Sequence, residues 1–304
     1  MPGLSLIIRK EISDAVSNRT FLLSLGVLIF ILLFSGYAAG IQFQQYISWG
    51  IYDTTGPYLT VIAYLVPNIN LLGALVAVVY GFNSINKERT EGSLKVMLSY
   101  PIFRDQVMLG KLLAGLFIIS IVTVVSFTIS LGVFLWFSNI LLKPDMILRY
   151  SIFTLLTILL LSGWLGISML LSQVFKDPKT TLLIMFLVVG LLNSNLFSYV
   201  GQILSHIVYG SAYYLSNGVV EYNPQLGALS TFIYYLPPPQ GYQIVSYNIA
   251  MPYTYTFIGN QMVYSPNELW NVFVNYVYSI GILIVVPILT FVGNYLLFTR
   301  KDIT

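Results

Sequence analysis

Long runs of apolar residues, separated by short polar stretches, cover most of the 304-residue chain. An α-helix needs about 20 consecutive apolar residues to cross the hydrocarbon core of a bilayer. Six runs reach that length, and we predict spans at 21–40, 59–82, 112–137, 150–174, 181–199 and 271–298. None of them contains Asp, Glu, Lys, Arg or His. The pattern therefore predicts an all-α integral membrane protein with six transmembrane helices.

Composition supports a bilayer rather than water as the solvent. The chain is 57% hydrophobic and only 8% charged, whereas soluble domains carry about 25% charged residues. We expect one transmembrane domain over residues 1–304. Its parts are an interfacial helix (1–20), spans one to five (21–200), an extracytoplasmic insertion (201–268), and span six with a cytoplasmic tail (269–304).

The scarcity of reactive side chains limits the kinds of catalytic and metal site that the chain can form. The chain has no cysteine and a single histidine, His206. Disulfides, thiolate catalysis and Cys- or His-rich metal sites are therefore excluded unless several chains share a site. The net charge of +3 is too small to indicate a nucleic-acid partner. We read His206 as a packed or interfacial residue, with a ligand role as the alternative.

Basic residues predict the orientation, because Lys and Arg concentrate in cytoplasmic loops. One set of loops holds 12 of them and the other set holds only two, Lys143 and Arg149. The larger set contains Arg9, Lys10, Arg19, Lys87, Arg89, Lys95, Arg104, Lys111, Lys176, Lys179, Arg300 and Lys301. We therefore expect both termini in the cytoplasm and a multi-pass protein of the cell membrane.

Residues 4–20 have the pattern of an amphipathic helix before the first span. Leu4, Ile8 and Ile12 recur at helical spacing, and Lys10 and Glu11 lie among the polar residues between them. Such a helix suits the plane of the membrane interface, with its apolar face towards the lipid. The alternative is a frayed juxtamembrane tail.

The loop after the second predicted span, residues 83–105, has the densest group of charges in the chain. Gly92 is expected to end the helix leaving the span, and Ser93 can cap a new short helix. Leu94 and Leu98 fall on one face of that helix, which Pro101 ends. A short helix lying across the membrane base could transmit force to a cytoplasmic partner. The alternative is an ordinary positively charged loop.

This loop resembles the signature of ABC-2-type transporter permeases. The matching positions are Glu88, Glu91, Gly92, Ser93, Leu94, Leu98, Pro101, Arg104, Gly110 and Lys111. Ser93 stands where the family usually has Thr, and Phe103 where a small polar residue is common. Lys10-Glu11 before span one and the six-span layout also resemble the family, loosely over the whole chain.

The resemblance implies the membrane subunit of an ATP-binding cassette exporter. The loop would be the coupling helix that docks on a nucleotide-binding subunit, with Glu88, Arg89, Glu91, Lys95 and Arg104 as contact candidates. A second, smaller contact is expected at the loop between spans four and five. There, whatever the function, Asp177 followed by Pro178 predicts a capped helix start.

The nucleotide is expected on a partner. The chain lacks the phosphate-cradling pattern G-x-x-x-x-G-K-[ST], because its Gly110-Lys111 is followed by Leu112. We therefore expect no cofactor and no ATPase site in this chain, with ATP and magnesium on a separate ATPase subunit. Family architecture would pair two permease protomers, identical or not, with two such subunits.

Polar residues within the predicted spans suggest a translocation pathway. Pro67 is expected to open the second span locally, and its amide neighbours need partners in a dry bilayer. The candidates are Pro67, Asn68 and Asn70 in span two and Thr123, Ser126 and Ser130 in span three. The alternative is plain helix packing, with hydroxyls bonded to their own helix.

The insertion at 201–268 contains 11 of the 23 tyrosines and a run of three prolines. Residues 253–264 alternate as a β-hairpin around a Gly259-Asn260 turn, pairing Phe257 with Met262 and Tyr255 with Tyr264. The remainder is expected to form short interfacial helices. We predict an ordered cap over the exit, or alternatively a structural lid that binds nothing.

Other functions compete with ATP-driven export. A secondary transporter or channel would favour ionisable residues within the spans or inverted repeats, and the sequence has neither. An intramembrane hydrolase would need catalytic groups that the spans lack. A non-transporting membrane anchor coupled to the same ATPase is a further alternative. The sequence does not identify the substrate.

Overall fold

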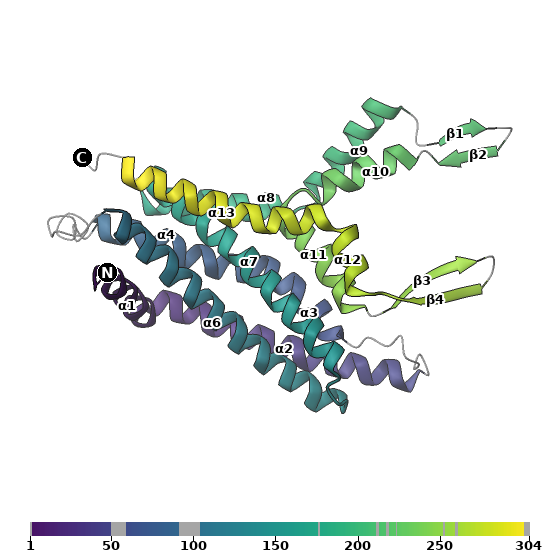
Figure 1. Ribbon diagram of the computed structural model, residues 1–304, viewed down its shortest axis with the longest axis horizontal. Coiled ribbons are helices and arrows are strands. Elements are labelled where there is room, and N and C mark those ends of the chain that lie inside the picture. Colours follow the sequence, from purple (N-terminus) through teal and green to yellow (C-terminus); the bar gives the residue numbers. More distant parts are fainter. Residues whose placement is uncertain are drawn as a thin grey trace.

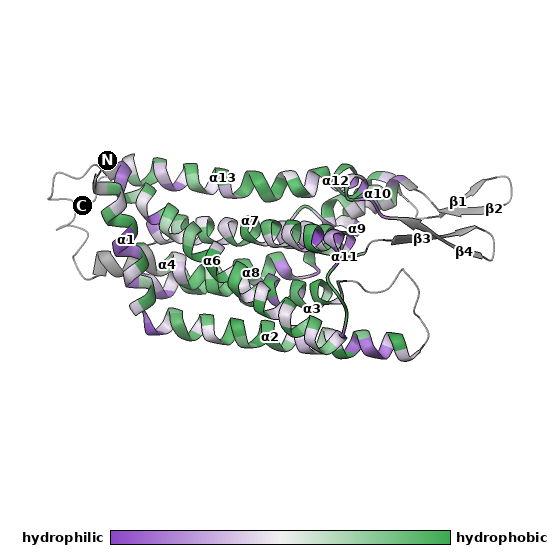
Figure 2. Ribbon diagram, turned by 60° about the horizontal axis from the view of Figure 1, so that its bottom comes forward, coloured by the Kyte–Doolittle hydropathy of each residue, from purple (hydrophilic) through white to green (hydrophobic). Residues whose placement is uncertain are grey.

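The computed structural model describes residues 2–49, 59–90, 104–175, 177–210, 213–216, 219–222, 224–251, 253–258 and 261–300. Within these ranges, five helices are long and apolar enough to cross a membrane, and a bent helix pair can supply a sixth crossing. The long helices run side by side in one bundle (Figure 1). Hydrophobic residues cover most of their length (Figure 2). The predicted helical membrane architecture is therefore confirmed.

A polar residue separates the N-terminal helix from the first crossing. Helix α1 is Pro2–Ser17, and α2 runs over Arg19–Ser48. The Asn18 side chain accepts hydrogen bonds from the backbone N–H groups of Thr20 and Phe21, at 3.0 and 3.3 Å. This N-cap satisfies donors that a helix start leaves free. Helix α2 extends beyond the predicted end at residue 40.

The second crossing is a helix with a π-turn in its middle. It consists of α3 (Thr60–Asn68), the π-turn η1 (Ile69–Gly73) and α4 (Ala74–Thr90). Pro67 lies inside α3, immediately before the π-turn. Because proline has no N–H and its ring crowds the preceding turn, the regular bonding pattern is disturbed there. The local opening predicted from Pro67 is thus present.

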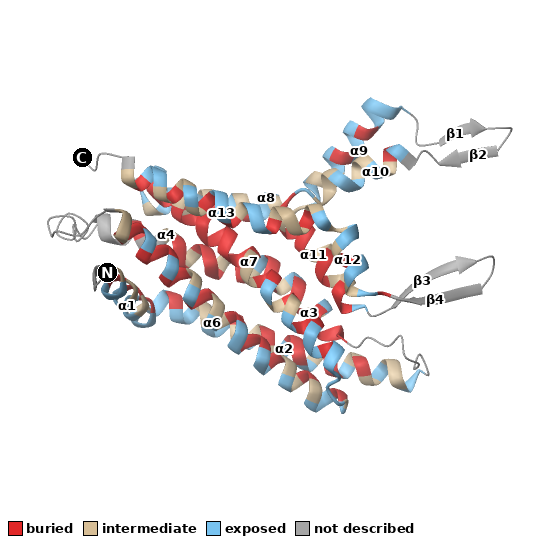
Figure 3. Ribbon diagram, in the orientation of Figure 1, coloured by how far each residue is buried: buried red, intermediate tan, exposed pale blue. Residues whose placement is uncertain are grey.

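The next two crossings are long helices. Helix α6 runs over Arg104–Ser138 and α7 over Pro144–Val174. Helix α6 therefore starts well before the predicted span at residue 112. Helix α7 is the most central element and is buried over much of its length (Figure 3). It packs against α4, α6 and α13.

The fifth crossing differs from the prediction of one continuous span to residue 199. Helix α8 is Pro178–Asn193, and α9 is Leu196–Tyr209, with a bend of 53° between them. Ser194 donates through its hydroxyl to the carbonyl of Leu191 and accepts from the N–H of Leu196. Because these side-chain bonds replace backbone bonds of a continuous helix, the chain turns here.

Two β-hairpins and two helices follow the bend. Strands β1 (Tyr213–Ser216) and β2 (Val219–Tyr222) pair antiparallel, as do β3 (Tyr253–Ile258) and β4 (Gln261–Pro266). In the second hairpin Tyr255 pairs with Tyr264 and Phe257 with Met262, the register that the alternation predicts. The predicted turn at Gly259 and Asn260 lies outside the described residues.

The helices α10 (Pro224–Tyr234) and α11 (Pro238–Ala250) do not both form an outer cap. Helix α10 packs on α9 at the edge of the molecule, but α11 contacts α3, α7 and α13 within the bundle. Side chains of α11 such as Tyr242 and Val245 are fully buried. The expected surface cap is therefore replaced in part by a helix that enters the bundle.

The last crossing begins with a short helix. Helix α12 (Leu269–Asn275) precedes α13 (Val277–Arg300), which packs against α7, α11 and α6. Both ends of the chain lie at one end of the bundle, and the two hairpins extend from the opposite end (Figure 1). We call these the terminal end and the hairpin end.

Candidate functional site

At the terminal end, a buried ion pair joins α1 to α6. The Lys111 Nζ atom lies 2.7 Å from the Glu11 carboxylate, and the two side chains are only 1% and 7% exposed. On the exposed side of α1, the Lys10 ammonium lies 3.7 Å from both Glu11 and Asp14. A buried pair of this kind holds two elements in one register, because separating them would leave a charge in an apolar environment.

A close backbone approach completes this contact. A Cβ atom on Gly110 would lie 2.5 Å from the Cγ2 atom of Ile7, so any larger residue there would force Ile7 or the helix to shift. Ile7 is itself buried. Gly110 and Lys111 thus form one side of a seat for α1, and Ile7 and Glu11 form the other. We call these four residues the elbow seat.

The elbow seat changes the interpretation of the Gly110-Lys111 motif. Both were predicted as part of the interface with an ATPase subunit. In the structure Lys111 is buried and points to Glu11, so it is not presented at the surface of this chain. Its physical role is to hold α6 against α1 near the start of α6, and not to contribute a side chain to an exposed interface.

The remaining predicted contacts are only partly described. Glu88 and Arg89 belong to the last turn of α4, and Arg104 begins α6, but their side chains are not described. Glu91, Gly92, Ser93, Leu94, Lys95, Leu98 and Pro101 lie outside the described residues. The helices α4 and α6 that flank this segment reach the terminal end, where α1 also lies (Figure 1).

Asp177 caps α8 as predicted. Its carboxylate accepts hydrogen bonds from the backbone N–H groups of Lys179 and Thr180, at 3.3 and 3.1 Å, and from the Thr180 hydroxyl at 2.7 Å. The bonds from Thr180, with a smaller contribution from Lys179, lower the pKa of the exposed Asp177 carboxyl. The negative charge also suits the positive end of the helix.

The predicted pathway residues do not share one surface. Thr123 and Ser126 line a small cavity of about 20 Å³, together with Ile69 and Gly73 of the π-turn. That space holds about one water molecule. Ser130 instead donates to the Leu32 carbonyl at 2.8 Å, and so binds α6 to α2.

The two asparagines of span two point to different neighbours. The Asn68 amide donates to the Ser35 hydroxyl at 3.0 Å and to the Tyr64 carbonyl at 2.9 Å. The Asn70 amide donates to the carbonyl of Pro239 at 3.3 Å. Asn70 thus contacts the first turn of α11, which lies far from it in the sequence.

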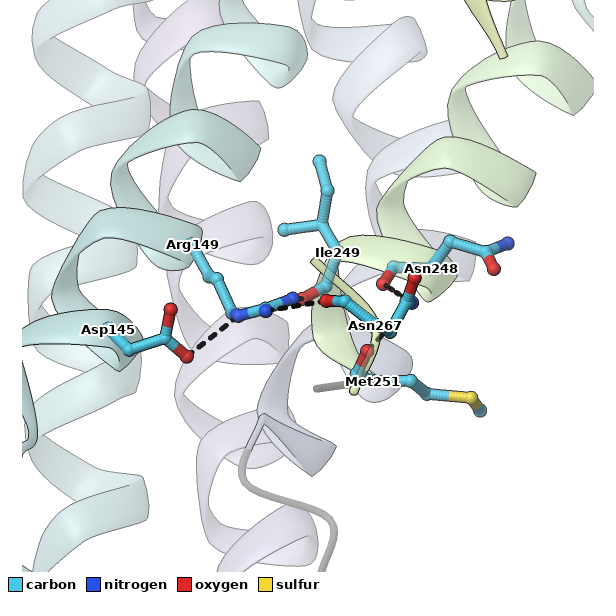
Figure 4. A network of polar contacts seen from close by, with 6 residues as sticks. All are labelled: Asp145, Arg149, Asn248, Ile249, Met251 and Asn267. Atoms are coloured by element: carbon cyan, nitrogen blue, oxygen red, sulfur yellow. Dashed lines mark hydrogen bonds and ion pairs between the residues drawn. The ribbon is translucent and has the colours of Figure 1, made fainter. Parts of the chain in front are cut away.

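A second buried charge lies at the hairpin end (Figure 4). Arg149 of α7 is 5% exposed. Its Nε donates to Asp145 at 2.8 Å, Nη1 to the Ile249 carbonyl at 3.1 Å, and Nη2 to the Asn267 carbonyl at 2.8 Å. The Asn267 amide donates to the carbonyls of Asn248 and Met251, both at 2.9 Å. Arg149 and Asn267 therefore satisfy the carbonyls at the end of α11.

Sequence reasoning treated Arg149 only as an outer loop charge. The spacing of Asp145 and Arg149 does indicate an i, i+4 pair on a helix. The partners at Ile249 and Asn267, however, are 100 and 118 residues away in the chain. No local pattern identifies them, because both offer backbone carbonyls.

Residues 5–303 match the pattern of the family described as ABC-2 family transporter protein. The chain belongs to this family. Two curated relatives, from Pseudomonas aeruginosa and Stutzerimonas stutzeri, are both named probable ABC transporter permease protein NosY. They are 33% and 32% identical over 127 and 121 residues, covering 42% and 40% of this chain and 44% and 41% of their own lengths.

These matches fit the structure. A member of this family with several helices that are long and apolar enough to cross a membrane is a multi-pass membrane protein. The matches to the two relatives span less than half of either protein's length.

Proposed function

We propose that this chain is the permease subunit of an ATP-driven exporter in the cell membrane, moving a substrate out of the cytoplasm. ATP and magnesium bind to a separate nucleotide-binding subunit. That subunit docks on the loop between α4 and α6, with a smaller contact near Asp177. A second permease protomer, identical or not, completes the membrane part.

The observation that carries this proposal is the elbow seat. Helix α6 continues without a break from Arg104 at the edge of the loop to Lys111, which holds Glu11 of α1. Helix α1 leads through Asn18 directly into α2. A displacement of the loop is therefore transmitted to α6 and, through the buried ion pair, to α1 and the first crossing.

The proposed orientation follows from the distribution of charge. Described basic residues at the terminal end include Lys10, Lys111 and Lys179, whereas Lys143 and Arg149 lie at the hairpin end. Since Lys and Arg are enriched in cytoplasmic loops, the terminal end faces the cytoplasm in this proposal. Both termini are then cytoplasmic, and the hairpins are outside the cell.

Co-purification tests the docking site. Residues 91–103 are replaced by a Gly/Ser segment of equal length, and the variant is co-expressed with the ATP-binding subunit that co-purifies with the parent permease. We expect the ATPase to be lost from the purified permease. The control replaces residues 50–58, which connect α2 to α3 in the sequence, in the same way and should retain the ATPase. Full retention after replacement of 91–103 would overturn the proposed docking site.

A further inference from the structure

A groove of about 440 Å³ lies between α6 and α7 on the surface of the bundle. Its walls come from residues within 124–131 of α6 and 147–158 of α7. Phe127 and Tyr150 also line it, and they are buried, so they form its floor. The Tyr150 hydroxyl donates to the Phe127 carbonyl at 2.9 Å. The two helices are therefore held together beneath the groove. We call it the α6–α7 groove.

The dimensions of the α6–α7 groove suit a single extended chain. From Ile147 to Ile158 the α7 wall rises about 16 Å at 1.5 Å per residue, which is about half of the roughly 30 Å hydrocarbon thickness of a bilayer. The volume of about 440 Å³ divided by this length gives a cross-section of about 27 Å². A helix about 10 Å across would need about 80 Å². The groove thus reaches through one leaflet and is too narrow for a helix.

The polar groups of the α6–α7 groove are already bonded within the chain. The hydroxyls of Thr128, Ser151 and Thr154 donate to carbonyls one turn earlier in their own helices, at 2.8, 2.7 and 2.8 Å. The other walls are aliphatic, and Ile147 and Leu155 are more than half exposed. A hydrocarbon chain can therefore fill the groove without leaving a hydroxyl donor unpaired, which would cost free energy.

Two side chains mark the depth of the groove in the membrane. Trp136, near the end of α6, is 79% exposed, and Lys143, at the start of α7, is exposed. Tryptophan is enriched at the membrane interface, and lysine extends its ammonium towards it. Ile147 follows Lys143 by one helical turn, so the groove begins just below the headgroups.

The mouth of the groove carries positive charge. Lys143 and Arg149 are positive, and Asp145, whose carboxylate accepts from Arg149 at 2.8 Å, is the one acidic residue between them. An ammonium has three donors, so Lys143 can bind a phosphate in addition to its contacts within the chain. This charge favours a phospholipid over an uncharged hydrocarbon.

We propose that the α6–α7 groove binds one acyl chain of a membrane phospholipid from the leaflet at the hairpin end, with its phosphate beside Lys143. The groove contacts the chain from two walls and a floor, so it offers more dispersion contacts than the convex face of a single helix. The bound lipid therefore exchanges more slowly than other lipids around the protein.

Photo-cross-linking tests the site. The full-length permease is placed in nanodiscs with phosphatidylglycerol that carries a diazirine midway along one acyl chain, and the insertion sites are mapped by peptide mass spectrometry. The reference positions are Phe34 of α2 and Ile284 and Val285 of α13, which are exposed apolar residues on other faces. We expect about fivefold more insertion per exposed residue in the groove than at these positions, because the groove surrounds the chain.

A matched pair of variants separates groove binding from general lipid contact. Thr128→Phe fills the groove, and the hydroxyl that it removes bonds only to its own helix. Val125→Phe adds a ring at a half-exposed position of the same helix outside the groove. Insertion in the groove should fall to the reference level in Thr128→Phe and stay at the parent level in Val125→Phe.

The phosphate contact has its own test. The diazirine is moved to phosphatidylglycerol or to phosphatidylcholine, and groove insertion is compared in the parent and in Lys143→Gln. The parent should favour the anionic lipid, and Lys143→Gln should lose that preference. An unchanged preference would overturn the placement of the phosphate.

Groove insertion no higher than at the reference positions would overturn the lipid site, and so would insertion that Thr128→Phe leaves unchanged. Insertion below the reference level would show that a second copy of the chain covers the groove instead. If Thr128→Phe does not yield monodisperse protein, Ser151→Phe fills the groove from the facing helix and carries the same expectation. These assays use the permease alone, so their outcome is independent of ATPase docking.

Discussion

The buried pair Glu11–Lys111 allows a quantitative test of how α1 is held. Replacement by Glu11→Gln keeps the shape of the side chain but removes the carboxylate that lies 2.7 Å from an ammonium only 1% exposed. Breaking one side of a buried ion pair costs about 3–5 kcal/mol. The neutral amide still accepts a hydrogen bond, so we expect the lower end of this cost. A loss of about 3 kcal/mol changes the equilibrium for undocking of α1 by about 100-fold.

The converse change should cost less. In Lys111→Met, the Glu11 carboxylate keeps Lys10 at 3.7 Å on the exposed side of α1, so the carboxylate is still near a positive charge. The double variant Glu11→Gln/Lys111→Met leaves no buried charge at this contact. Its cost should be well below the sum of the single costs, because an apolar replacement of a whole pair is often nearly neutral.

Limited trypsin digestion measures the undocking. Arg9 and Lys10 are cleavage sites on α1, and cutting requires the helix to leave its seat. The cleavage rate should rise strongly for Glu11→Gln and return towards the parent in the double variant. Asp14→Asn is the matched control: Asp14 is 53% exposed and also lies 3.7 Å from Lys10, and an exposed pair contributes at most about 1 kcal/mol. Strictly additive effects would refute the reasoning.

Two further predictions concern the same end of the protein. Gly110→Ala should destabilise the elbow seat by about 1–3 kcal/mol through overpacking, because the new Cβ would lie 2.5 Å from Ile7 Cγ2. Adding Ile7→Ala to this variant should restore most of the loss, as measured by the same trypsin digestion. No rescue in the double variant would argue against the close approach. The lowered pKa of Asp177 means that its capping bonds stabilise the folded state above the ordinary carboxyl pKa and are lost as pH falls through the lowered value. In the parent, the hydrogen-exchange protection of the Thr180 amide should therefore fall as the pH is lowered, and in Asp177→Ala this acid-dependent fall should be absent. The same acid profile in the variant and in the parent would count against the cap.

The elements predicted well are those encoded locally. Uninterrupted apolar runs mark the crossings, Pro67 marks the opening of the second crossing, and Asp177-Pro178 marks the start of α8. The alternation around residues 253–264 identifies the strand pairs of the second hairpin. In each case the physical cause lies within a few residues of the effect, so a single sequence contains it.

The features that were missed depend on distant partners. Glu11 and Lys111 are 100 residues apart, and the Arg149 contacts span similar distances. The bend after Asn193 was missed because an apolar run continues on both sides of the polar residues there. The burial of α11 was missed because its composition is only moderately apolar, and its place in the bundle depends on contacts with three other helices.

The bend between α8 and α9 affects how the protein fits its membrane. Helix α8 has 16 residues and rises about 24 Å, less than the roughly 30 Å thickness of a hydrocarbon layer. Helices α8 and α9 together are long and apolar enough to cross, and α9 and α10 diverge sideways from the bundle (Figure 1). As a result, the described part of the chain is broader at the hairpin end than at the terminal end (Figure 1).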